Sequence, residues 1–183
     1  MIFIKKRMRI NRLWIFAVAV VTTLACLMTS CGAMNKSYLI EDYGIKLKAP
    51  SSWEQTDVAN YDLHLMCEDK TINAGFFGYT DDELGEDMTV AEMFDMQNKI
   101  ALEHCENIKC IEQVTQADIS GGILLQTLFS AEKDGSENSY LFCLYDIDNS
   151  DKMLWGAFIG SADAVSANRE AASDIMSSAK AAD

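Results

Sequence analysis

The sequence changes character at Cys31, and this change confines the folded part of the chain to the residues that follow. An almost wholly apolar run of 16 residues extends from Leu13 to Met28. The 30 residues before Cys31 contain no acidic side chain, and five basic residues form their head: Lys5, Lys6, Arg7, Arg9 and Arg12. A basic head, an apolar run and small residues after it are typical of a secretory signal peptide. The run is shorter than the ~20 residues that a spanning helix needs, which disfavours a transmembrane anchor.

The residues around this cysteine read Leu27-Met28-Thr29-Ser30-Cys31-Gly32. They resemble the lipobox of bacterial lipoproteins, in which the cysteine thiol is joined to a diacylglycerol and the peptide is cut just before it. Met28 stands where that family most often has leucine, and Cys26 is a competing cysteine that apolar residues still follow. The resemblance implies that Cys31 is the lipidation site.

This reading divides the chain into three parts. Residues 1–30 are expected to be a lipoprotein signal peptide, residues 31–36 the lipidated cysteine and a short tether, and residues 37–183 a single domain. The expected location is the extracytoplasmic side of the cell membrane, where the lipid on Cys31 holds the protein. The length after the tether is enough for one hydrophobic core.

The folded part is strongly acidic once the leader is set aside. The whole chain has 15 basic and 28 acidic residues, and removing the five basic residues of the leader leaves 10 − 28 = −18. This charge excludes nucleic acid as the expected partner, because binding to phosphates needs basic patches. It also opposes adhesion to anionic lipid, so attachment must come from acyl chains, of which two anchor stably.

Alternating apolar residues predict strands in the first half of the domain. A hairpin is expected over residues 37–49, with strands over 61–68 and 72–79, and an acidic loop over 81–87. Thr89 and Glu92 fit a capping box that starts a helix extending to about Glu106. The apolar face of that helix is expected to consist of Val90, Met93, Phe94, Ile100, Ala101 and Cys105.

The second half predicts four more strands and a closing helix. The strands are expected over 108–115, 122–131, 139–147 and 153–160, with a hairpin loop over 132–138. Ser161 or Asp163 is expected to cap a helix to about Lys180. Its inner face would consist of Val165, Ala172, Ile175 and Ala179. Consecutive runs of antiparallel strands, rather than βαβ alternation, indicate the α+β class.

Two short motifs in the first hairpin resemble the PsbP-like family. They are Asp42-Tyr43-Gly44-Ile45 and Pro50-Ser51-Ser52-Trp53. This family includes the photosystem oxygen-evolving accessory protein, Ran-binding Mog proteins, and DcrB-like and other small bacterial lipoproteins. The resemblance implies an antiparallel sheet with packed helices in an αβα sandwich. It also implies a non-enzymatic protein that binds partners or assists assemblies, and no family site residue maps onto this chain.

Histidines and cysteines raise the possibility of a metal site, but their spacing does not favour one. His64 and Cys67 are expected on opposite faces of a strand, and neighbouring His104 and Cys105 point about 100° apart on a helix. We therefore predict no metal site. The disulfide state stays open, because four cysteines allow three pairings or free buried thiols: Cys67, Cys105, Cys110 and Cys143.

Residues 146–151 have the alternating oxygen ligands of a calcium loop. The loop lacks glycine at its sixth position, Asp151, and an acidic residue at its twelfth, Ala157. A hairpin turn is the better interpretation.

Neither a Gly-x-Ser-x-Gly motif nor a Gly-rich phosphate loop is present, so we expect no cofactor. Three hypotheses remain. The first is an envelope lipoprotein that binds an envelope protein or complex. The second is a small-ligand or metal-binding lipoprotein that serves a transporter, and the third, disfavoured, is an envelope hydrolase.

Overall fold

Strands that follow one another in the sequence lie side by side over much of this chain. The structure is a computed structural model that describes residues 36–84 and 88–182. Its elements are, in order, β1 (Lys36–Ile40), η1 (Glu41–Tyr43), β2 (Ile45–Ala49), β3 (Glu54–Gln55), β4 (Leu63–Met66), β5 (Ile72–Thr80), α2 (Asp81–Leu84), α3 (Val90–Ala101), β6 (Glu106–Ile119), β7 (Gly122–Lys133), β8 (Ser136–Ile147), β9 (Lys152–Gly160), α4 (Ala162–Ala167), α5 (Arg169–Ser177) and β10 (Lys180–Ala181).

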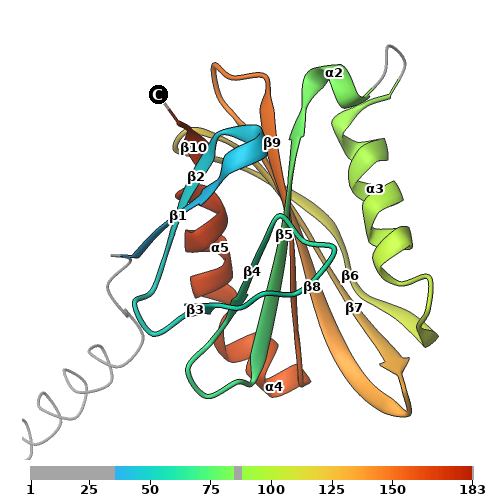
Figure 1. The fold of residues 1–183 in the computed structure, drawn as a ribbon. Helices are drawn as coiled ribbons and strands as arrows, with labels where there is room; N and C mark the ends of the chain where they lie inside the picture. Colours follow the sequence, from blue (N-terminus) through green and yellow to red (C-terminus); the bar gives the residue numbers. More distant parts are fainter. Residues whose placement is uncertain (1–35, 85–87, 183) are drawn as a thin grey trace, which may run out of the picture. The chain divides into compact units, whose positions relative to one another are not determined.

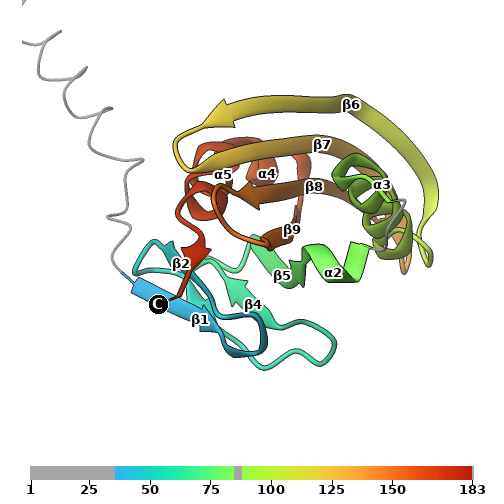
Figure 2. The same ribbon diagram turned by 90° about the horizontal axis from the view of Figure 1, so that it is seen from above.

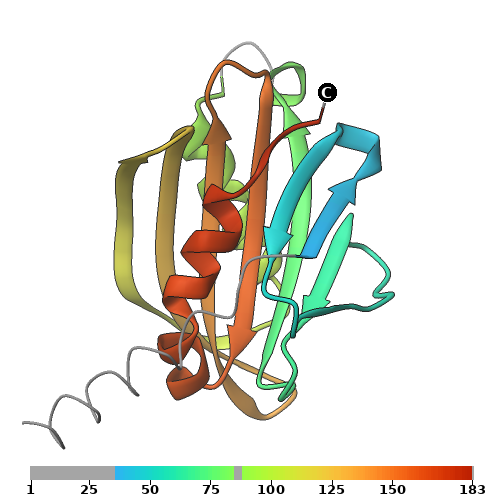
Figure 3. The ribbon, with the colours of Figure 1, turned by 90° about the vertical axis from the view of Figure 1, so that its left-hand side faces the viewer.

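The described strands form two antiparallel sheets. The larger sheet has seven strands in the order β3-β4-β5-β9-β8-β7-β6, and the smaller has three in the order β1-β2-β10. Strands β6 to β9 form a meander, and β9 returns to pair with β5 over the full length of both strands. Helix α5 and the smaller sheet lie next to each other over one face of the larger sheet (Figure 3).

Helices cover both faces of the larger sheet, with α5 on one side and α3 on the other (Figure 1). Successive residues of β7 therefore enter different cores: Leu124 packs on the α5 side, and Leu125 packs on the α3 side. On the α3 side, Phe142 and Trp155 stack with ring centroids 5.5 Å apart. The predicted α+β class and αβα sandwich are confirmed. None of the helices in the described part of the chain combines the length and apolar character needed to cross a membrane.

Strand β6, at the outer edge of the larger sheet, is irregular (Figure 2). Its register against β7 shifts three times, between Glu106 and Lys109, between Cys110 and Glu112, and between Glu112 and Thr115. Each shift is an extra residue in β6, which changes the face to which the next side chains point.

These shifts place consecutive residues of β6 on the same face. Ile111 and Glu112 line a cavity on the α5 side, whereas Gln113 and Val114 line one on the α3 side. Thr127 of β7 is buried, and its hydroxyl donates to the Glu112 carbonyl at 2.7 Å, which holds the chain between the second and third shifts. Strand β6 thus contributes to both faces of the molecule.

Several local predictions are confirmed. The first hairpin forms, and Gly44 at its turn has φ of 57°, a value that glycine adopts without strain. Thr89 and Glu92 form both hydrogen bonds of the capping box at the start of α3. Ser161 caps α4, because its hydroxyl accepts from the Ala164 N–H at 3.2 Å.

Helix α3 ends at Ala101, so the prediction that it extends to Glu106 was wrong. Glu106 instead pairs with Glu132 at the start of β6, and sheet pairing overrides the helical pattern there. Ile100 was assigned to the inner face and is 56% exposed, so that assignment was also wrong.

The predicted acidic loop begins as the short helix α2 at residues 81–84, where the Glu83 carboxylate accepts from the Thr80 N–H; residues 85–87 lie outside the described part.

The closing helix is interrupted, which the sequence analysis did not predict. It forms two segments that meet at Asn168, whose side chain donates to the Ala164 carbonyl and so satisfies the end of α4. Helix α5 ends at Ser177 rather than near Lys180, because Lys180 and Ala181 form β10 against β2. The four residues predicted for its inner face are all buried: Val165, Ala172, Ile175 and Ala179.

The hairpin between β7 and β8 is tighter than predicted, because the strands continue to Lys133 and resume at Ser136. Asp134 and Gly135 make the whole turn with φ of 53° and 74°. Positive φ at both positions matches the right-handed twist of the strands.

Candidate functional site

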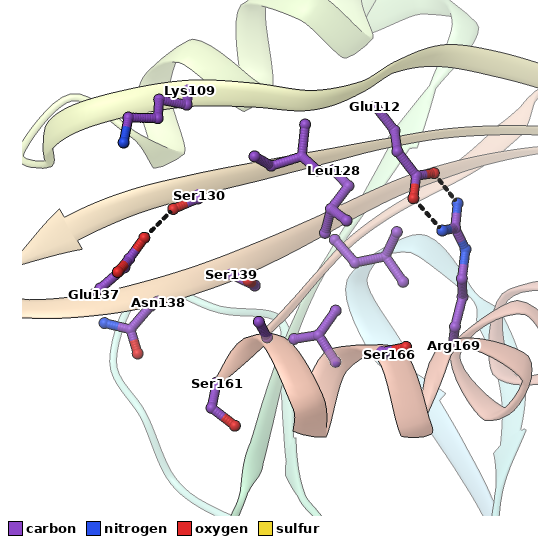
Figure 4. Close-up of a pocket in the computed structure, with 14 residues that line it drawn as sticks. Lys109, Glu112, Leu128, Ser130, Glu137, Asn138, Ser139, Ser161, Ser166 and Arg169 are labelled. Carbon is purple, nitrogen blue, oxygen red and sulfur yellow. Dashed lines mark hydrogen bonds and ion pairs between the residues drawn. The ribbon is translucent and has the colours of Figure 1, made fainter.

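A groove of about 440 Å³ lies between helices α4 and α5 and strands β6, β7 and β8. Figure 4 shows its side chains converging from both sides, with Arg169 reaching from the helices towards the strands. Its floor is apolar and consists of Leu128, Leu141, Val165 and Ile111. Hydroxyl groups surround this floor, on Ser130, Ser139, Ser161 and Ser166. An apolar floor with a few polar groups at its rim is typical of a ligand-binding site.

One end of the groove is defined by an ion pair between β6 and α5. Arg169 donates to both carboxylate oxygens of Glu112, at 2.7 Å and 2.6 Å. The guanidinium holds the pKa of Glu112 below its usual range, first through these hydrogen bonds and then through its charge. Both side chains are more than a third exposed, so the pair stabilises the fold by about 1 kcal/mol or less. Its main effect is to fix where the charges lie.

The other end continues into a second, smaller cavity. This cavity measures about 150 Å³ and shares Lys109, Ser130 and Glu137 with the groove. Ser130 donates to Glu137 at 2.8 Å (Figure 4), and Asn107 donates to Glu132 at 2.8 Å. The two cavities together form an elongated surface across the ends of three strands.

The serines of the groove have no histidine beside them, and the carboxylate that accepts from Ser130 is that of Glu137. The lining of the groove includes several serines, but no histidine or cysteine. Glu112 is a weakened base because Arg169 lowers its pKa. The arrangement can hold an extended segment with an apolar centre and polar or charged ends, and this is the chemistry it supports best.

His64 lies away from the groove, on β4. Its side chain is buried, its Nδ1 shares a hydrogen bond with the Thr56 hydroxyl, and Tyr61 lies beside it with ring centroids 5.6 Å apart. Burial lowers the pKa of His64, so the ring is neutral around pH 7. It lines a separate polar cavity with Asp57 and Asp62 and is not in the groove.

The four cysteines in the described part of the chain are free thiols and do not come together with the histidines. Cys67 and Cys143 are buried, and burial raises the pKa of the Cys143 thiol to about 12. His104 is exposed. Cys105 and Cys110 both line a cavity on the α3 side of the sheet, where Cys105 donates to Tyr140 at 3.5 Å.

Among residues 36–84 and 88–182, no three histidine, cysteine, aspartate or glutamate side chains are grouped as metal ligands. Residues 146–151 join β8 to β9, which confirms the hairpin interpretation of the calcium-like loop. Burial raises the pKa of Asp146, and the charges of Asp81 and Asp148 raise it further. Cys31 and the predicted signal peptide lie outside the described residues, so the lipidation site stays a prediction.

The sequence analysis did not identify the groove, although it named Val165 as a core residue and Ser161 as a helix cap. One signal was present, because Arg169 is the sole arginine after residue 12. An arginine in an acidic domain commonly fixes a carboxylate or an anionic ligand through its planar, two-pronged donor set. Its partner Glu112 could not be identified from periodicity, since register shifts interrupt β6 on both sides of it.

Comparison with known proteins bears on the fold. No protein-family model matches the sequence, and no curated protein does. Among solved structures, cyanobacterial PsbP (CyanoP) from Synechocystis matches with a TM-score of 0.58 at 14% identity, over 85% of this chain and 99% of that chain. This chain has the PsbP/Mog fold.

Two further structures with the PsbP/Mog fold belong to proteins that are described differently from each other. The Ran-binding protein Mog1p of Saccharomyces cerevisiae matches with a TM-score of 0.58 at 8% identity, over 82% of this chain and 97% of that chain. LpqN of Mycobacterium tuberculosis, described as involved in cell envelope biogenesis, matches with a TM-score of 0.56 at 13% identity, over 79% and 88%. Such low identities establish the shared fold and leave the site to be argued from this chain.

Proposed function

We propose that this protein is a non-enzymatic envelope lipoprotein, anchored through Cys31, that binds an envelope protein or complex through the groove. The observation that carries the proposal is the groove itself, with its apolar floor and the Glu112–Arg169 pair at one end. Anchoring rests on the lipobox-like sequence and on the acidic charge, which leaves acyl chains as the means of attachment.

Two considerations support a binding role over the alternatives. The PsbP/Mog fold is found in a Ran-binding protein and in a protein involved in cell envelope biogenesis, both named for interactions or assembly rather than for a reaction. The groove also spans β6, β7 and β8 and continues into a second cavity, so it suits an extended segment of a partner better than a compact substrate.

Crosslinking in the cell envelope tests this proposal. A photo-crosslinking amino acid at position 111 places the reactive group in the groove, because Ile111 is 56% exposed and lines it. We expect a discrete crosslinked species that contains an envelope protein. The charge reversal Arg169→Glu should reduce it strongly, because it places two carboxylates against each other at the end of the groove.

The matched control has the same crosslinker at position 39. Leu39 is 49% exposed and lies on β1, in the smaller sheet. The groove proposal would be wrong if both positions gave the same species, or if position 111 gave none above background.

A further inference from the structure

The cavity on the α3 side of the sheet, lined in part by Cys105 and Cys110, is separate from the groove and from the small cavity that continues it. It measures about 390 Å³, within the range of small-molecule sites. Much of its wall is formed by Asn98 of α3, Leu102 just after that helix, Phe129 of β7, and Ile108 and Val114 of β6. The sequence analysis identified no ligand site in this part of the chain.

The cavity is elongated. Its lining residues on α3 are Asp95, Asn98 and Lys99, which span about 6 Å along the helix axis, and Leu102 and Glu103 follow in the turn after the helix. On β6 they extend from Ile108 to Val114. A space bounded by a helix on one side and a strand on the other suits a flexible chain better than a flat ring system.

Asn98 gives this apolar space a directed polar group. Its side chain is only 4% exposed, and its Oδ1 accepts from the indole N–H of Trp155 at 3.0 Å. Because indole nitrogen can only donate, this bond fixes the orientation of the amide. The amino group of Asn98 forms no hydrogen bond with another described residue and is open to solvent, because no enclosed side-chain nitrogen in the described part lacks a partner, so it can donate to an acceptor that enters the cavity.

The charges at the rim argue against an anionic occupant. Asp95, Lys99 and Glu103 give one basic and two acidic side chains, on a domain that already carries a large negative charge. Electrostatic repulsion therefore disfavours a free fatty acid, whereas an uncharged head with a carbonyl or hydroxyl oxygen can accept from Asn98.

We propose that this cavity binds a neutral single-chain amphiphile, with the acyl chain along α3 and β6 and an acceptor oxygen of the head at Asn98. The site differs from the groove and does not depend on a partner binding there. Ile108 and Val114 are 47% and 45% exposed, and an acyl chain would cover these apolar side chains.

The probe is a photoactivatable analogue of monolauroylglycerol, added to the full chain in phosphatidylcholine nanodiscs. We expect crosslinks that map by mass spectrometry to residues lining the cavity, between Asn98 and Phe129. The lauric acid analogue should label less because it is anionic. Bound probe should also slow the reaction of Cys110, an exposed thiol of the lining, with a water-soluble thiol reagent.

Three variants make the test specific. Asn98→Asp keeps an acceptor for Trp155 but removes the donor, and we expect labelling to fall about fivefold, as for one lost hydrogen bond. Val114→Asn should reduce labelling because it removes apolar contact. Since Val114 is 45% exposed, this variant still tests the proposal if Asn98→Asp impairs folding. Leu39→Asn is the matched control and should label as the parent chain does, because Leu39 is 49% exposed, lies on β1 and lines neither the groove nor this cavity.

The proposal is overturned if crosslinks spread over the whole surface, or if Val114→Asn labels as strongly as Leu39→Asn. Labelling by the lauric acid analogue that equals the monolauroylglycerol analogue would also contradict it, because the rim charges would then have no influence. If the crosslinker at position 111 captures no envelope protein but the lipid probe still labels this cavity, the proposed function is wrong and the proposal of a lipid site stands.

Discussion

His64 illustrates how burial alone sets the behaviour of a single side chain. The neutral ring is favoured in the folded protein because burial lowers its pKa. In the unfolded chain the ring takes up a proton as the pH falls through about 6.5. The unfolded state therefore binds more protons below that pH, and the free energy of unfolding falls as the pH decreases towards the lowered pKa.

We expect His64→Gln to weaken this pH dependence, because glutamine can still share a hydrogen bond with Thr56 but does not titrate. Urea unfolding at pH 8 and pH 5 measures it, and the parent chain should lose more free energy of unfolding than the variant. Burial raises the pKa of Asp62 and Asp146, which acts in the opposite direction, but both carboxyls are present in the two proteins and cancel in the comparison. Equal losses in parent and variant would contradict the assignment.

At the scale of single elements, α3 depends on the capping box formed by Thr89 and Glu92. The Thr89 hydroxyl accepts from the Glu92 N–H at 3.2 Å, and the Glu92 carboxylate accepts from the Thr89 N–H at 2.9 Å. We expect Thr89→Ala to lower the free energy of unfolding by about 1 kcal/mol, as measured by urea denaturation. Thr89→Ser keeps the hydroxyl and should lose little; a loss as large as that of alanine would mean that the methyl group, not the cap, matters.

The elements that could be predicted are those whose signal is local. Alternation and turn residues located the first hairpin, and the capping box located the start of α3. The end of α3 and the end of α5 were wrong, because pairing of Glu106 with Glu132 and of Lys180 with Lys46 decides them. These partners are distant in sequence, and no periodicity within either helix reports on them.

The candidate sites were harder to predict for the same reason. The groove joins β6 to α5, 57 residues apart along the chain at the Glu112–Arg169 pair, and the register shifts in β6 remove the regular alternation from which faces are read. Asn98 shows the same difficulty. In the sequence it is one polar residue of a helix, and its orientation depends on a hydrogen bond with Trp155, which is also 57 residues away.

At the scale of the whole molecule, the sequence predicts attachment through one residue. We expect Cys31→Ala to abolish labelling with a radioactive or clickable fatty acid, because the thiol that carries the diacylglycerol is gone. The variant should stay uncleaved or leave the membrane fraction, which gel mobility and fractionation measure. Continued labelling would point to Cys26 instead, and Cys26→Ala is therefore the control that should label normally.

The irregular register of β6 has a consequence for how copies of this protein can associate. An exposed edge strand of 14 residues is a template on which another copy could polymerise. Only Thr115 to Ile119 pair with β7 in an unbroken register of more than two residues, so a second strand would meet a ladder that is interrupted three times. The same extra residues that direct side chains towards two different cavities therefore also hinder edge-to-edge pairing with another copy.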